Sequence, residues 1–142
     1  MGWGDDVRVC IAPFYKGEDR ADGGIRRVVE AQAAYLPRYG WDVTDSPDEA
    51  DLIACHGATL AERPGVPLVN HNHGLMWDDY TFGPWGDDVN AHVVEAMVRA
   101  EAVTAPSRWV AHAISRGMLV APEVVYHGVD PDAWAHTQPH LG

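Results

Sequence analysis

Positive charge is scarce in this sequence of 142 residues. Lysine occurs once, at Lys16, and the 10 Lys and Arg residues are outnumbered by 21 Asp and Glu residues, which gives a formal net charge of −11. A chain this acidic repels the phosphate backbone of a nucleic acid. We therefore expect no nucleic-acid partner, and a strongly anionic ligand would need local arginines.

Long apolar runs and targeting features are also missing. No run approaches the roughly 20 apolar residues that a membrane helix needs. The N-terminus has neither the positive region nor the apolar stretch of a signal peptide, and there is no Asn-X-Ser/Thr sequon. The two cysteines, Cys10 and Cys55, lie in short apolar segments and are expected to be buried free thiols, with a disulfide or a reactive thiol as alternatives. These features predict a cytoplasmic protein with no membrane span.

Short apolar segments alternate with helical patterns along the chain. Buried strands are expected at 7–13, 41–44, 52–55, 66–70, 102–105 and 123–126, and helical spacing covers 25–39, 89–100 and the stretch from a Ser107 cap to Gly117. Gly40 is placed to end the first helix, and Ser46-Pro47 with Glu49 resembles another helix start. This order predicts an α/β fold: a Rossmann-like, mostly parallel sheet with helices on both faces. We expect one domain over residues 1–134 and a linker remnant or tail over 135–142.

Three polar segments follow predicted strands, at 14–24, 71–79 and 127–131, where parallel sheets bind ligands. In the first, Gly23 and Gly24 precede a helix, and the exposed N–H groups of a helix start favour an anion. Arg26 and Arg27 add positive charge nearby. The alternative is a flexible glycine loop without a ligand. No GxGxxG and no Walker loop occurs, so simple dinucleotide binding is not supported.

The segment 71–79 is the densest in polar and aromatic side chains, among them His71, His73, Trp77, Asp78 and Asp79. The imidazoles could act as acid, base or hydrogen-bond donor to a polar substrate. The indole offers a flat surface of the kind that stacks on sugar rings, and the two carboxylates can accept hydrogen bonds from hydroxyls. Two alternatives stay open: a metal site completed by His56, and loop histidines with a packed tryptophan and no function.

In combination, four features resemble the N-terminal half of a retaining glycosyltransferase of family 4, with the GT-B architecture. They are Gly23-Gly24 before a helix, His73-Gly74 after the fourth strand, the sequence AVTAPSRWV at 102–110 and the sequence VYHGVD at 125–130. The resemblance implies a sugar transferred from a nucleotide-sugar donor to a hydroxyl acceptor with retained configuration. It also implies that no metal or other cofactor is needed, with the nucleotide-sugar as co-substrate.

The same resemblance implies roles for individual residues. The Gly23-Gly24 loop would approach the donor diphosphate, and His73 would be the catalytic residue near the donor sugar, with His71 as its alternative two residues earlier. Trp77, Asp78 and Asp79 would lie towards the acceptor. Helix dipoles and basic side chains would stabilise the leaving diphosphate.

One departure from the family pattern is large. The Arg/Lys pair and the Glu-x₇-Glu segment of the second, donor-binding domain do not occur in the sequence. We therefore expect little or no turnover from this chain alone, and a C-terminal GT-B domain as its partner, in cis or in trans. Two other functions stay open: a stand-alone sugar- or partner-binding module, and a metal-dependent hydrolase that uses His56, His71 and His73.

Overall fold

A computed structural model describes residues 6–14, 23–76, 84–117, 120–128 and 131–134. Six parallel strands form one sheet in the order β2-β1-β3-β4-β5-β6. The strands are β1 (Arg8–Ala12), β2 (Asp42–Thr44), β3 (Leu52–His56), β4 (Leu68–His71), β5 (Ala102–Ala105) and β6 (Glu123–Val124). The predicted parallel α/β sheet is confirmed, and each predicted strand is present.

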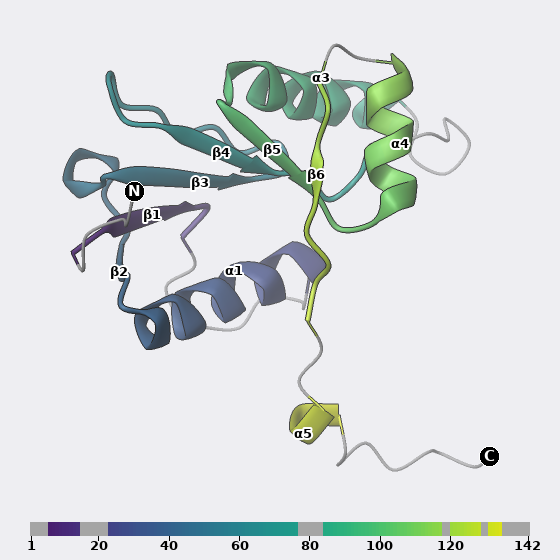
Figure 1. The fold of residues 1–142 in the computed structure, drawn as a ribbon. Coiled ribbons are helices and arrows are strands. Elements are labelled where there is room, and N and C mark those ends of the chain that lie inside the picture. The colour runs from purple at the N-terminus through teal and green to yellow at the C-terminus, as the bar shows by residue number, and fades with distance from the viewer. Residues whose placement is uncertain (1–5, 15–22, 77–83, 118–119, 129–130, 135–142) are drawn as a thin grey trace.

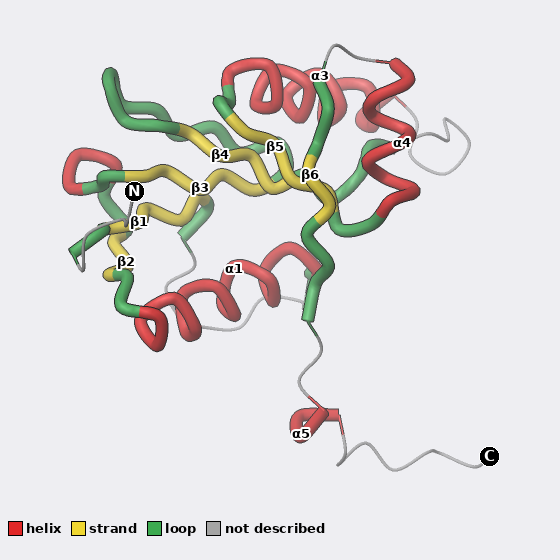
Figure 2. The backbone as a smooth tube through the Cα atoms, viewed as in Figure 1, coloured by secondary structure: helices red, strands yellow, loops and turns green. Residues whose placement is uncertain are grey.

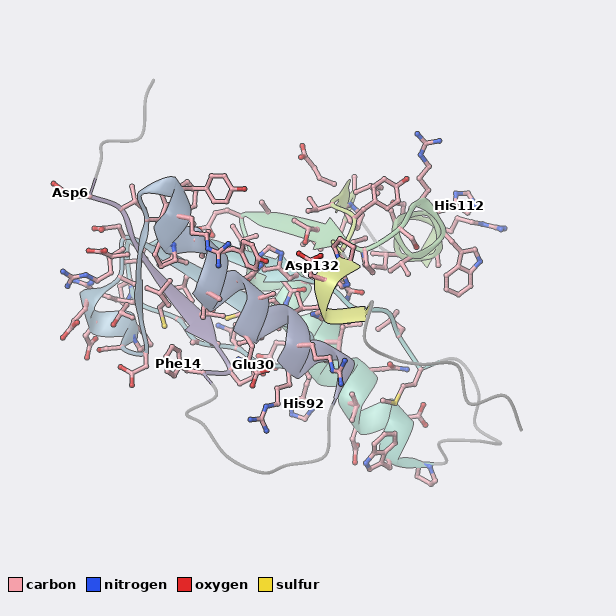
Figure 3. The ribbon with its side chains drawn as sticks, turned by 90° about the horizontal axis from the view of Figure 1, so that it is seen from below. Asp6, Phe14, Glu30, His92, His112 and Asp132 are labelled. Atoms are coloured by element: carbon pink, nitrogen blue, oxygen red, sulfur yellow. The ribbon has the colours of Figure 1, made fainter. Side chains whose placement is uncertain are left out.

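Helices cover both faces of this sheet (Figures 1 and 2). On one face lies α1 (Gly24–Tyr35), and on the other lie α3 (Pro84–Arg99) and α4 (Arg108–Gly117). A last helical turn, α5 (Pro131–Trp134), follows β6. In the view from below, α1 with Glu30 lies on the near side of the sheet, and His112 marks α4 at the margin (Figure 3). No helix in the described ranges is both long and apolar enough to cross a membrane.

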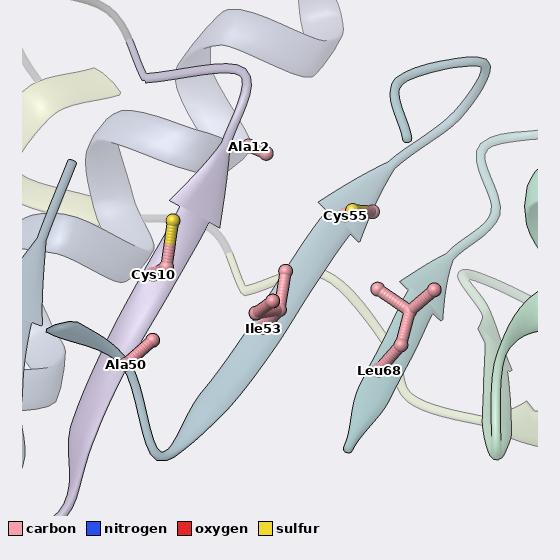
Figure 4. Close-up of a cluster of buried hydrophobic side chains, with 6 residues drawn as sticks. All are labelled: Cys10, Ala12, Ala50, Ile53, Cys55 and Leu68. Carbon is pink, nitrogen blue, oxygen red and sulfur yellow. The ribbon is translucent and has the colours of Figure 1, made fainter. Parts of the chain in front are cut away.

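The alternation of side chains along each strand divides the core between the two faces. Val9 and Ile11 of β1 pack with Val29 of α1 on one face. The intervening Cys10 packs with Ile53 and other buried side chains on the opposite face, a cluster made of Cys10, Ala12, Ala50, Ile53, Cys55 and Leu68 (Figure 4). Both cysteines are free and buried there, as predicted. A third cluster packs α3 and α4 against β5.

The first helix shows how local sequence sets an element's end. The predicted helix 25–39 forms as α1 followed by a 3₁₀ turn, η1 (Leu36–Tyr39). Pro37 lacks the N–H that would continue the α-helical pattern. Gly40 then adopts the left-handed conformation, with φ of 84°, and its N–H bonds back to Leu36 and Pro37. The predicted stop at Gly40 is confirmed.

Other predicted boundaries are confirmed or corrected. The Ser107 hydroxyl accepts a hydrogen bond from the Val110 N–H at 3.2 Å, which confirms the predicted cap of α4. The predicted start at Ser46 is only a 3₁₀ turn, η2 (Pro47–Glu49), without a side-chain cap. The Thr44 hydroxyl instead accepts from the Ser46 N–H and contacts the Glu49 carboxylate, so the capping box does not form.

Two further corrections concern the second half of the chain. Residues 84–88 belong to α3, although the helix predicted here begins only at residue 89. The apolar spacing begins only at Val89, but Pro84 suits the first helical position and Asp87 lies in the first turn, where its charge is favourable. The expected strand 123–126 is limited to β6, and a helical turn that the sequence did not predict, α5, lies at the end of the range 1–134 expected for the domain.

Candidate functional site

Histidines gather at the carboxyl edge of the sheet. His56 ends β3 and His71 ends β4, and these two residues are paired in the parallel register. His73 follows β4 by two residues, and His127 follows β6. The ring centroid of His56 lies 4.9 Å from that of His71 and 5.3 Å from that of His73. The ring centroids of His73 and His127 are also 5.3 Å apart. The topology therefore brings into one cluster four imidazoles that span 72 positions of the sequence, 56 to 127.

The strand alternation directs this cluster towards α1. Ala54 packs in the core cluster on the α1 face, and His56, two positions on, shares that face. Its register partner His71 points the same way, as does Thr104, which pairs with His71 across β4 and β5. Gln32 reaches this group from α1. The site thus combines side chains from a helix and three adjacent strands.

A continuous chain of hydrogen bonds joins these side chains. Nδ1 of His71 lies 2.7 Å from the Thr104 hydroxyl, and Nε2 of His71 lies 3.3 Å from the Gln32 amide nitrogen. The Gln32 amide oxygen lies 2.8 Å from Nε2 of His56. Nδ1 of His56 lies 3.0 Å from Nε2 of His73. Both ring nitrogens of His56 and both of His71 are therefore engaged within the protein.

Burial keeps three of these imidazoles neutral. Desolvation, and then the neighbouring histidines, lower the pKa of His56 to about 3. Desolvation and His127 lower the pKa of His71 to about 4, and desolvation, His127 and His71 lower the pKa of His73 to about 4. Near neutral pH all three act as hydrogen-bonding groups without charge. They cannot neutralise a diphosphate, but they can bind and orient hydroxyl groups.

Two asparagine amides hold the loop that carries His73. Asn72 is 2 % exposed, and its side-chain oxygen accepts the Gly74 N–H at 2.6 Å. Gly74 has φ of 114°, a conformation that other residues rarely adopt. Further on, the Asn90 amide of α3 bonds to both the N–H and the C=O of Met76, at 2.8 and 2.6 Å. The backbone on both sides of His73 is thus tied to the rest of the domain.

The predicted glycine turn lies at the start of α1. Gly23 is the N-terminal cap, in an extended conformation and without a side-chain cap for the first N–H groups of the helix. A Cβ at Gly23 or Gly24 would meet nothing within 4 Å among the described residues. Packing against the part of the chain that the structure describes therefore does not require glycine here. Arg26, in the same turn, forms an ion pair with Glu30 at 2.7 Å.

The first turn of α1 also lies against the loop that follows His56. Gly57 has φ of 58°, and a Cβ there would meet the Ile25 side chain at 3.4 Å. The Gly57 N–H donates to the His71 backbone oxygen at 3.1 Å, which joins the ends of β3 and β4. The glycine turn and the histidine cluster are therefore connected through α1 and this loop. Trp77, Asp78 and Asp79, predicted to face the acceptor, lie outside the described residues.

Two members of the cluster are absent from the sequence-based set. Gln32 lies at helical spacing from Ile25 and Val29, within the apolar face of α1, and a polar residue in such a stripe is a usable signal. Thr104 lies inside a short strand and carries no comparable signal until the register pairs it with His71. Among the described residues, no group of three or more His, Cys, Asp or Glu side chains is arranged to hold a metal ion.

Comparison with known proteins gives one result. The family model described as Glycosyltransferase Family 4 matches residues 4–133, well over half of the chain. No curated protein and no solved structure gives a significant match. The matched range contains all six strands, the glycine turn before α1 and the four clustered histidines.

Proposed function

Because the chain belongs to glycosyltransferase family 4, we propose that it is the acceptor-side half of a retaining GT-B glycosyltransferase. The reaction moves a sugar from a nucleotide-sugar donor to a hydroxyl acceptor. The observation that carries the proposal is the neutral histidine cluster at the carboxyl edge of a parallel sheet, next to a helix that starts with two glycines. This edge is where such sheets bind ligands.

Charge divides the proposed site into two parts. The donor diphosphate lies at the N-terminus of α1, where the helix dipole favours an anion and Gly23 and Gly24 leave room for close approach. His73 contacts the donor sugar near the reacting carbon. Its neutral, half-buried imidazole suits a hydroxyl group better than a phosphate. Trp77, Asp78 and Asp79 contact the acceptor.

A second Rossmann-like domain completes the donor site in this proposal. The sequence contains no Glu-x₇-Glu segment, so the groups that hold most of the donor come from that domain, in cis or in trans. The chain alone then binds a nucleotide-sugar weakly and transfers little or no sugar. A stand-alone sugar-binding module, the second function that the sequence left open, would bind a glycan equally well without any partner domain.

Ligand titrations followed by amide NMR spectra test the division of the site. UDP-glucose and GDP-mannose are titrated into the chain, and inorganic pyrophosphate and a methyl glycoside serve as partial ligands. We expect pyrophosphate to shift the amides of Gly23 and Gly24, the glycoside to shift those near His73, and at least one nucleotide-sugar to shift both. Exposed His112 on α4 supplies a reference signal that no ligand should move.

Activity supplies the second test. With the chain and its donor-binding domain together, His73→Ala should lower turnover far more than it weakens donor binding, and the product should keep the donor's anomeric configuration. His112→Ala is the matched control. Unchanged turnover in His73→Ala, or an inverted product, would contradict the proposal. A chain that binds glycans but transfers none with any partner domain would favour the binding module.

A further inference from the structure

We infer that Gln32 is a positioning residue: through His56 it sets the tautomer of His73 and leaves Nδ1 of His73 as a hydrogen-bond acceptor. A hydroxyl group can bind at such an atom, whereas an anionic oxygen cannot. The identity of that hydroxyl, a sugar hydroxyl of the donor, rests on the proposed function. The tautomer itself does not.

The argument begins at the Gln32 amide, whose two ends have opposite hydrogen-bonding roles. Its oxygen only accepts, so Nε2 of His56, 2.8 Å away, must carry the hydrogen. Its nitrogen only donates, so Nε2 of His71, 3.3 Å away, must present a lone pair. One amide therefore imposes opposite tautomers on two histidines that are paired across β3 and β4.

The effect passes from His56 to His73. A neutral imidazole carries one hydrogen, so His56 with hydrogen on Nε2 has a lone pair on Nδ1. Among the described residues, the group within hydrogen-bond distance of this lone pair is Nε2 of His73, 3.0 Å away, which must then carry the hydrogen. His73 then has its own lone pair on Nδ1. Among the described residues no side chain or backbone group donates to that atom.

The other end of the chain of bonds agrees with this direction. His71 with a lone pair on Nε2 carries its hydrogen on Nδ1 and donates it to the Thr104 hydroxyl at 2.7 Å. A threonine hydroxyl both donates and accepts, so Thr104 fits either direction and does not select one. Gln32 is the member of the chain whose atoms have fixed roles. The orientation of its amide, with the oxygen towards His56 and the nitrogen towards His71, therefore sets the polarity of all four hydrogen bonds.

The consequence for binding follows from the polarity. A lone pair on Nδ1 of His73 accepts a hydrogen bond from a neutral O–H group and repels the lone pairs of a phosphate or carboxylate oxygen. The opposite polarity would present an N–H, which anions prefer. Gln32 thus makes the His73 position selective for a hydroxyl-bearing ligand, without contacting the ligand itself.

The tautomers can be measured directly in the ¹⁵N-labelled chain, because protonated and unprotonated imidazole nitrogens have widely separated ¹⁵N shifts. Spectra recorded at pH 8 should show His56 and His73 with hydrogen on Nε2 and His71 with hydrogen on Nδ1. Substitutions at Gln32, with exposed His112 as the control position, test whether Gln32 determines these tautomers. If His73 carries its hydrogen on Nδ1 in the unsubstituted chain, the inference is overturned.

Two substitutions at Gln32 separate its role from simple packing. In Gln32→Glu, a carboxylate accepts from both imidazoles, so His71 should change to the Nε2–H tautomer while His56 and His73 keep theirs. In Gln32→Met, a side chain of similar length without polar atoms should leave a mixture of tautomers at all three histidines. His112→Ala should change none of them. Unchanged His71 in Gln32→Glu would contradict the inference even if Gln32→Met fails to fold.

A ligand titration keeps this inference distinct from the proposed function. A methyl glycoside should shift Nδ1 of His73, and inorganic phosphate should leave it unmoved. Phosphate shifting Nδ1 of His73 in preference to the glycoside overturns the selectivity. If the tautomers are as expected but no glycoside or nucleotide-sugar shifts any signal, the proposed function is overturned. The role of Gln32 in setting the tautomers is then unaffected.

Discussion

Nδ1 of His56 lies 3.0 Å from Nε2 of His73, so these two rings share one hydrogen that only one of them can carry. His56 is 1 % exposed and belongs to the sheet, whereas His73 lies on the loop beyond it. A buried strand residue therefore controls the protonation of the loop residue that we propose to contact the substrate. The protonation of His73 therefore depends on the correct placement of His56 in the folded sheet.

Acid should destabilise the fold because of these histidines. In the unfolded chain each imidazole binds a proton below about pH 6.5, whereas His56, His71 and His73 remain neutral in the folded state down to about pH 3 to 4. The unfolded state therefore binds more protons in this range, and the free energy of unfolding falls as the pH falls. We expect a loss of about 1–2 kcal/mol for each of these three histidines between pH 6.5 and 5.

Urea unfolding at pH 7, 6 and 5 measures this loss. The window lies above the range in which most carboxylates take up protons, so the histidines dominate it. His56→Gln removes one buried imidazole and should give a shallower dependence on pH. His112→Gln, at an exposed position, should follow the unsubstituted protein. Equal slopes for the unsubstituted protein and His56→Gln would mean that burial of His56 does not govern acid stability.

Thr104 should stabilise the fold through its hydroxyl. In Thr104→Val the shape is preserved, but the Nδ1–H group of His71 loses the acceptor that lies 2.7 Å away. An unpaired polar group in a mostly buried position costs about 1–3 kcal/mol. Thr104→Ser keeps the hydroxyl and is the matched control, with a smaller loss. The denaturation midpoints of the two variants at pH 7 measure the two losses of stability. If Thr104→Val loses no more stability than Thr104→Ser, the hydroxyl of Thr104 does not stabilise the fold.

The thiols should be unreactive in the folded protein. Burial raises the pKa of both Cys10 and Cys55, and the two side chains are 2 % and 0 % exposed. The thiolate is the reactive form, so both burial and pKa slow alkylation. Iodoacetamide at pH 8 should modify neither residue in buffer and both in urea, as read by intact mass. Fast labelling of the folded chain would show that the cluster around them opens.

The sequence was sufficient for the fold because its signals are local. The apolar segment 102–105 is followed by Pro106, which has no N–H to donate to a sheet. Gly40 and Ser107 carry their capping information in their own chemistry. The errors also have local causes. Residues 84–88 lack apolar spacing although they form the start of α3. At the Ser46 turn, the side chain that accepts a backbone hydrogen bond is Thr44 and not Ser46.

The candidate site could be predicted only in part, because its key contacts are set by register. The sequence indicated His71 and His73 as a pair and His56 as a possible third member. The pairing of His56 with His71, and of His71 with Thr104, depends on how three strands align, which no single segment encodes. The role of Gln32 depends on the same alignment. The boundary expected at residue 134 and the roles of Trp77, Asp78 and Asp79 stay predictions.

A substitution at Gly24 can test ligand binding separately from stability. A Cβ at this position meets nothing within 4 Å among the described residues, and alanine favours a helix over glycine by up to about 1 kcal/mol, so Gly24→Ala should leave stability unchanged or raise it. The same methyl group would lie at the helix start where we propose that the donor diphosphate approaches. We therefore expect weaker binding of pyrophosphate and of nucleotide-sugars, measured by titration, in a protein that unfolds at the same or higher urea concentration.

Gly117→Ala, at the end of α4 and equally uncrowded, is the control and should bind normally. Unaltered pyrophosphate binding in Gly24→Ala would place the anion elsewhere, because only a ligand close to the backbone is sensitive to one added carbon.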